Sequence, residues 1–148
     1  MWNPSKSVTL SSLCTKIVIA LVLCFALVAP SLVSSYLSYT QKNIELFTPL
    51  LITIYACCLP AMLALLNLDR LLANIRKDFV FTENNVRHLR VISWCCFAVA
   101  LVLAISGFYY ILFLMVAVAA AFFGLILRVV KNVIEQAMII KNENDFTV

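Results

Sequence analysis

Six cysteines carry the most reactive side chains of this chain, and they fall as two isolated residues and two adjacent pairs: Cys14, Cys24, Cys57, Cys58, Cys95 and Cys96. Zinc sites and dithiol redox sites space their cysteines as C-x-x-C. Neighbouring residues on a helix point about 100° apart, so an adjacent pair does not readily chelate one metal ion. We interpret the cysteines as small apolar fillers. Soft-metal or redox sensing, and palmitoylation of Cys14, are weaker alternatives.

The only imidazole is that of His88, which stands between Arg87 and Leu89. General-base catalysis needs an oriented partner for the histidine, and the neighbouring sequence supplies none. A His/Glu zinc motif is also missing, and two glycines cannot form a glycine-rich phosphate loop. We therefore predict that the protein is not an enzyme and that it uses no cofactor or metal.

The segment FVFTENNVRHLRVISW, residues 79–94, contains the signals of a helix start. Thr82 is the predicted N-cap, because its hydroxyl can accept a hydrogen bond from a free amide of the first turn. Glu83 places a negative charge at the positive end of the helix dipole. Phe81 precedes the cap and is expected to pack against Val86 as a hydrophobic staple. The segment thus predicts a helix that begins at Thr82 and continues into apolar sequence.

Polar side chains around this helix start form a candidate surface for docking a protein partner. The candidate docking residues are Arg76, Lys77, Asn85, Arg87, His88 and Arg90. A simpler interpretation, anchoring by positive charge together with helix capping, also explains most of these residues.

The composition places the chain in a membrane. It is 64% hydrophobic and 12% charged, whereas soluble domains average about 45–50% and about 25%. Three stretches contain no Asp, Glu, Lys or Arg: 17–41, 46–68 and 91–127. A spanning helix needs about 20 apolar residues to cross a hydrocarbon layer of about 30 Å. The first two stretches therefore provide one span each.

The third stretch is too long for one span, because a single helix over it would extend roughly 55 Å. Ser106-Gly107 is the breaker near its middle, and Tyr109 and Tyr110 suit the membrane interface. We predict an all-α integral membrane four-helix bundle, one domain over 1–148, with spans at about 16–35, 46–68, 88–106 and 109–130. A cleaved signal peptide is a less favoured reading of the first helix, because its apolar run is long enough to span.

The second helix is expected to continue as an amphipathic extension into a cytoplasmic loop over 69–90. We interpret this extension as a cover for the cytoplasmic end of the bundle, and a helix lying along the membrane surface is the alternative. After the fourth span, a cytoplasmic C-terminal helix is predicted over 128–141.

Basic residues set the expected orientation. With the N-terminus inside, ten of the eleven Lys and Arg residues face the cytoplasm and only Lys42 faces outward. This strong bias predicts cytoplasmic termini and a multi-pass protein of the cell (cytoplasmic) membrane. The net charge of +4 then attracts the protein to anionic lipid, and no direct nucleic-acid partner is needed to explain it.

Small residues recur at four-residue spacing in the fourth span, as Ala117/Ala121 and Ala120/Gly124. Such pairs let helix backbones approach closely in lipid. They can serve packing within the bundle or a homo-oligomer, and we favour internal packing.

The stretch RLLANIRKDFVFTENNVRHLRVISW resembles the DUF2975 family of small bacterial four-helix membrane proteins. The residues that carry the resemblance are Phe81, Thr82, Asn85, Arg87, Leu89 and Arg90. This chain departs from the pattern at Asn84, where an acidic residue commonly precedes the asparagine, and in its cysteines. The resemblance implies a bacterial inner-membrane protein without known enzymatic activity. It also implies a regulatory partner, since members are often encoded beside a small helix-turn-helix regulator.

Two functional hypotheses follow. The first is a regulatory or interaction protein that docks a cytoplasmic partner, such as a small helix-turn-helix regulator, on its basic inner face. The alternative is a small oligomeric transporter, channel or immunity-type membrane protein. The polar groups available within the spans for such transport are sparse: Thr48, Thr53, Tyr55, Ser93 and Ser106.

Overall fold

The computed structural model describes residues 4–77 and 80–147, and this part of the chain is almost entirely helical. Four long helices and one short 3-10 helix follow in the order α1 (Pro4–Thr40), η1 (Ile44–Leu46), α2 (Phe47–Arg76), α3 (Glu83–Ser106) and α4 (Leu112–Phe146). Each of the four long helices is long and apolar enough to cross a membrane. The predicted all-α fold with four potential spans is confirmed.

The helices extend beyond the apolar stretches of the sequence. α1 has 37 residues and α4 has 35, which at about 1.5 Å per residue gives more than about 50 Å each, against a hydrocarbon layer of about 30 Å. The i to i−4 hydrogen bonding of a helix does not stop where the side chains become polar. Both helices therefore have polar ends that project beyond any span.

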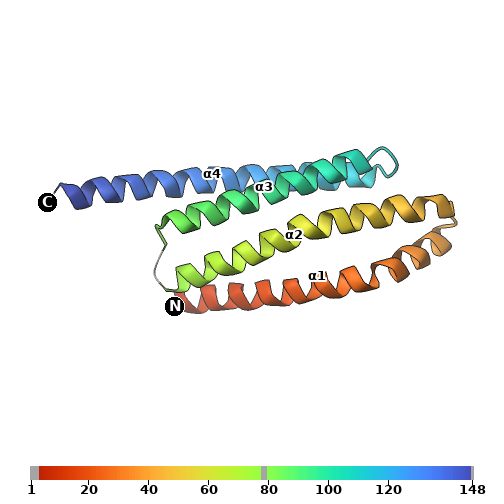
Figure 1. Ribbon diagram of the computed structural model, residues 1–148, viewed down its shortest axis with the longest axis horizontal. Coiled ribbons are helices and arrows are strands. Elements are labelled where there is room, and N and C mark those ends of the chain that lie inside the picture. Colours follow the sequence, from red (N-terminus) through yellow and green to blue (C-terminus); the bar gives the residue numbers. More distant parts are fainter. Residues whose placement is uncertain (1–3, 78–79, 148) are drawn as a thin grey trace.

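The helices form a row in chain order. α1 packs against α2, α2 against α3 and α3 against α4, and these three seams hold nearly all the contacts between helices. Figure 1 shows this row, with both ends of the chain at the same side of the molecule. We call that side the basic end; it includes the α2–α3 junction. The opposite side, with η1 and residues 107–111, is called the turn end. The arrangement is more open than the expected bundle.

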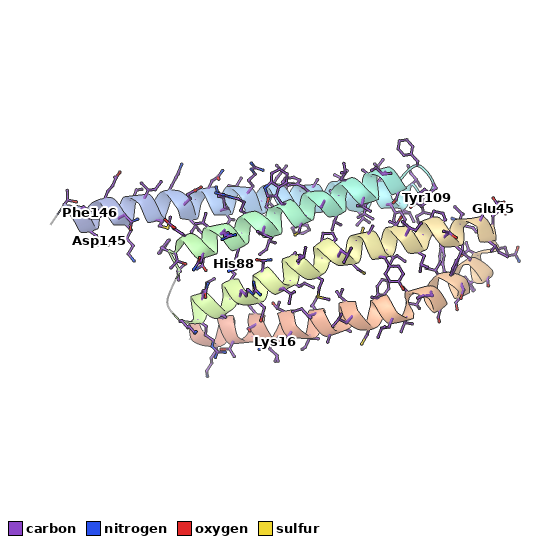
Figure 2. The ribbon with its side chains drawn as sticks, viewed as in Figure 1. Lys16, Glu45, His88, Tyr109, Asp145 and Phe146 are labelled. Carbon is purple, nitrogen blue, oxygen red and sulfur yellow. The ribbon has the colours of Figure 1, made fainter. Side chains whose placement is uncertain are left out.

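The turn end is where the row closes. Buried Val33, Leu37 and Leu50 form a cluster, and Tyr109 and Phe113 pack against it from the α3–α4 side. α3 ends at Ser106, and residues 107–111 make the turn before α4. Figure 2 places Tyr109 and Glu45 together at this end, far from Phe146. Contacts among α1, α2 and the start of α4 thus converge at the turn end.

The α3–α4 seam depends on small residues of α4. Ala117 and Gly124 are buried. The Ser93 hydroxyl donates to the carbonyl oxygen of Gly124 at 2.8 Å. A Cβ atom at Gly124 would lie 3.2 Å from the ring of Phe97 and 3.3 Å from the Cβ of Cys96. In this chain, the small residues at 117 and 124 serve the close approach of two consecutive helices.

Candidate functional site

The α2–α3 junction is held by the buried side chain of Asn85. It is 1% exposed. Its Nδ2 donates to the carbonyl oxygen of Val80 at 2.9 Å, and its Oδ1 accepts from Asn74 Nδ2 at 2.9 Å. One amide therefore connects the last turns of α2, the connecting segment and the first turn of α3. A buried polar group with its hydrogen bonds satisfied favours one geometry of its surroundings.

Burial changes the interpretation of Asn85. A side chain that is 1% exposed offers no surface to a docked protein, so we assign Asn85 to the junction and no longer to the docking surface. Its partner Asn74 was missed in the sequence, where it counted as one polar residue of the amphipathic extension. The sequence did contain a signal for this pairing, because the two asparagines lie close in sequence on either side of the loop.

Thr82 occupies the N-cap position of α3, with extended backbone angles of φ −128° and ψ 149°. The predicted hydroxyl cap is nevertheless wrong. Thr82 Oγ1 is buried and has no hydrogen-bond partner within the described residues. The amide of Asn85 donates to the Thr82 carbonyl oxygen at 3.1 Å instead. A backbone hydrogen bond thus closes the first turn, and the Asn85 amide that the Thr82 hydroxyl would have capped is bound to the Thr82 carbonyl.

The other residues of the helix-start motif have distinct environments. Glu83 lies in the first turn of α3, where the dipole argument places it. Val86 is buried at 5% exposure, whereas Phe81 remains 46% exposed. The packing of Phe81 against Val86 stays a prediction.

His88 connects α3 to α2. Its Nδ1 lies 2.8 Å from Asn67 Oδ1, and the Asn67 amide group donates to the carbonyl oxygen of Leu63 at 2.7 Å. Since the Asn67 oxygen can only accept, Nδ1 carries the hydrogen in this arrangement. Figure 2 shows His88 on the side of α3 that faces α2. The geometry gives this side chain a positioning role between the helices.

Four of the candidate docking residues present exposed positive charge: Arg76, Lys77, Arg87 and Arg90. Arg76 and Lys77 end α2. Arg87 and Arg90 are three residues apart on α3 and therefore share one face. A hollow of about 390 Å³ lies beside them, between the start of α3 and the extension of α4, and is lined by Glu83, Asn84, Val86, Arg87, Arg90, Glu135 and Met138.

Glu135 of α4 organises the cations on the α3–α4 side. It forms an ion pair with Lys131, one helical turn earlier, and its carboxylate lies 3.8 Å from Arg90. The residue lies beyond the charge-free stretch of α4. The hydrogen bond from Lys131, followed by the charges of Lys131 and Arg90, lowers the pKa of Glu135. Its carboxylate is therefore ionised at neutral pH.

Polar side chains in the apolar part of the helices form hydrogen bonds across the seams, to another side chain or to a backbone carbonyl. Thr53 bonds to Ser106 at 2.8 Å, and the Tyr55 hydroxyl donates to the carbonyl oxygen of Ala26 at 3.1 Å. The Ser93 hydroxyl has the bond to Gly124 described above. Of the five polar groups considered for a transport pathway, four therefore join neighbouring helices: Thr53, Tyr55, Ser93 and Ser106.

The cysteines do not converge on a metal site among the described residues. All six are free thiols; Cys14 and Cys24 are exposed, and Cys95 is buried. In residues 4–77 and 80–147, no group of three or more His, Cys, Asp or Glu side chains is placed to hold a metal ion.

Four apolar helices in a row, with polar ends and charged junctions, indicate a multi-pass membrane protein. Within that class, the chain belongs to the DUF2975 family, described as a protein of unknown function, whose model matches residues 9–148. This match confirms the resemblance seen in the 70–94 segment and extends it over nearly the whole chain. Neither a curated protein nor a solved structure matches the chain.

Proposed function

We propose that the protein is a non-enzymatic regulatory membrane protein that docks a soluble cytoplasmic protein on its basic end. The observation that carries the proposal is the group of four exposed cations at the α2–α3 junction: Arg76, Lys77, Arg87 and Arg90. The excess of Lys and Arg at this end favours a cytoplasmic location. A partner with an acidic surface is the electrostatic complement.

The junction presents these charges on a fixed frame. Asn85 ties the segment after α2 to the first turn of α3, and His88 ties α3 to Asn67 of α2. Charges that are already positioned need less ordering when a partner binds, so more of the interaction energy appears as affinity. A frame of this kind suits recognition of a particular protein.

The projecting part of α4 adds apolar surface next to the cations. Ile139 and Ile140 are 51% and 60% exposed, and Phe146 is 91% exposed. Figure 1 shows that α4 continues past the beginning of α3. Exposed apolar side chains beyond the membrane mark an interaction surface. The partner class implied by the family resemblance is a small helix-turn-helix regulator.

The test is affinity capture from native membranes after mild crosslinking. The variant Arg87→Glu with Arg90→Glu reverses two charges of the docking surface, and we expect it to lose the soluble partner. The matched control, Lys6→Glu with Lys16→Glu, makes the same change of charge on α1 and is expected to retain the partner. Equal capture by wild type and the Arg87/Arg90 variant, with both inserted in the membrane, would contradict the proposal.

A further inference from the structure

A second, smaller hollow lies between α3 and α4, and its lining is strongly basic. Its volume is about 160 Å³, and it is lined by Arg90, Ser93, Trp94, Arg128, Lys131 and Asn132. Three of these six side chains are cationic and none is a carboxylate. Two of the three cations, Arg128 and Lys131, belong to no candidate site found in the sequence.

The hollow lies at a defined level of the molecule. Arg90 is the last charged residue before the charge-free stretch 91–127, and Arg128 is the first charged residue after it. α3 and α4 are consecutive antiparallel helices packed along their length, so both leave the apolar region at this same level. For a membrane-spanning hairpin, that level is the boundary between hydrocarbon and water.

Trp94 marks the same boundary. Its side chain is 59% exposed, and the guanidinium of Arg128 lies 5.5 Å from the centre of its ring. Tryptophan is enriched where hydrocarbon meets the lipid headgroups. A cation over the ring face is also held in place by the ring quadrupole. The contact therefore positions a guanidinium at headgroup depth, beside the hollow.

The local charge favours the binding of an anion. The Lys131 side chain is only 13% exposed and pairs with Glu135, and the carboxylate of Glu135 also lies near Arg90. Three cations against this one carboxylate leave an excess of two positive charges. A phosphodiester carries one negative charge and oxygens that a guanidinium can bind through two parallel hydrogen bonds.

We propose that the hollow between α3 and α4 binds the headgroup phosphate of an anionic phospholipid. A dissolved phosphate offers the same oxygens. The position of the hollow at the boundary between hydrocarbon and water, and the exposure of Trp94, favour a lipid headgroup as the source of the phosphate. Basic pockets between spanning helices are suited to anionic headgroups. Arg90 lines this hollow and also belongs to the proposed docking surface, whereas Arg128, Lys131 and Trp94 belong to the hollow alone and are the residues that the test changes or observes.

The experiment uses Trp94 as the reporter. The variant Trp2→Phe leaves Trp94 as the single tryptophan of the full chain, which is reconstituted in mixed phosphatidylcholine and phosphatidylglycerol vesicles. Bromine on the acyl chains of one lipid or the other quenches the fluorescence of nearby tryptophan. We expect brominated phosphatidylglycerol to quench beyond its share of the lipid. In the same background, Arg128→Gln with Lys131→Gln is expected to lower this preference about tenfold.

Two controls distinguish a specific lipid site from a general attraction of anionic lipid to the basic end. Arg76→Gln with Lys77→Gln removes the same charge from another part of the basic end and is expected to keep the preference. If that control loses it equally, or if the Arg128/Lys131 variant keeps it, the proposal is overturned. Competition by millimolar inorganic phosphate would identify a site for dissolved anions and would also overturn the lipid assignment. If the double variant does not fold, Arg128→Gln alone applies the same test at an exposed residue.

Discussion

Asn85 is the residue on which the α2–α3 junction depends most directly, since its amide joins Asn74 to the carbonyl of Val80 from a fully buried position. Truncation would remove these bonds and leave the Asn74 donor without this partner. We expect Asn85→Ala to lower the free energy of unfolding by about 1–3 kcal/mol, the usual cost of unsatisfied buried polar groups. Denaturant titration in detergent micelles measures this loss.

The matched control is Asn84→Ala, which removes the same amide from an exposed neighbour in the same helical turn. It is expected to change the free energy of unfolding by less than about 0.5 kcal/mol. Equal effects of the two substitutions would refute the structural role assigned to Asn85.

Thr82 provides the opposite case, a buried hydroxyl that has no hydrogen-bond partner among residues 4–77 and 80–147. Replacing an N-cap threonine usually costs about 1 kcal/mol, because the cap bond is lost. Here there is no such bond to lose, so Thr82→Val, which keeps the shape of the side chain, is expected to leave stability unchanged or to raise it. A loss of about 1 kcal/mol or more in the same unfolding measurement would show that the hydroxyl does cap α3.

Individual side chains were the hardest level to predict from the sequence. The position of the helix start was readable, because Thr82 and Glu83 stand at the change from polar to apolar sequence. The sequence did not show whether a given polar residue faces a partner or the interior, because Asn85 and Arg87 are two residues apart in a segment that is mostly polar. Their burial is decided by how α2 approaches α3, which is a tertiary property. Arg128 and Lys131 could not be recognised as part of a site from the sequence for the same reason.

At the scale of elements, the seam between α3 and α4 is set by the missing side chain of Gly124. Its carbonyl accepts from Ser93 at 2.8 Å, and the ring of Phe97 lies where a larger residue would extend. Gly124→Val is expected to force the helices apart and to cost about 1–3 kcal/mol, as overpacking does elsewhere. Unfolding of the variant in micelles gives the value.

Ala119→Val adds bulk to an exposed position of the same helix and serves as the comparison. Its stability should match that of the wild type. If both variants are equally stable, close approach at Gly124 is not what holds this seam together.

The four helices themselves were predictable, because apolar runs of sufficient length leave the backbone few alternatives in a membrane. The break at Ser106-Gly107 was also predictable, since a 37-residue charge-free run must turn back. The full lengths of α1 and α4 were not, because helical hydrogen bonding continues through polar sequence. The order of the helices in a row was not predictable either, since small residues indicate close packing but do not identify the partner helix.

At the scale of the whole molecule, the expected orientation places the basic end in the cytoplasm. In a chain without native cysteines, Lys42→Cys at the turn end should react with a membrane-impermeant maleimide in intact cells or spheroplasts. Asn144→Cys near the end of α4 should react only after permeabilisation. The reverse pattern would place the docking surface outside and would contradict the proposed cytoplasmic partner.

The row of helices has a consequence for how the protein is made. Each seam joins two helices that are consecutive in the chain, so each helix after α1 can pack against the helix synthesised immediately before it. Contacts between segments close in sequence form quickly, since little loop-closure entropy opposes them. Assembly can therefore proceed vectorially, helix by helix, as the ribosome delivers the chain to the membrane. The last seam to form is the one that creates the α3–α4 hollow.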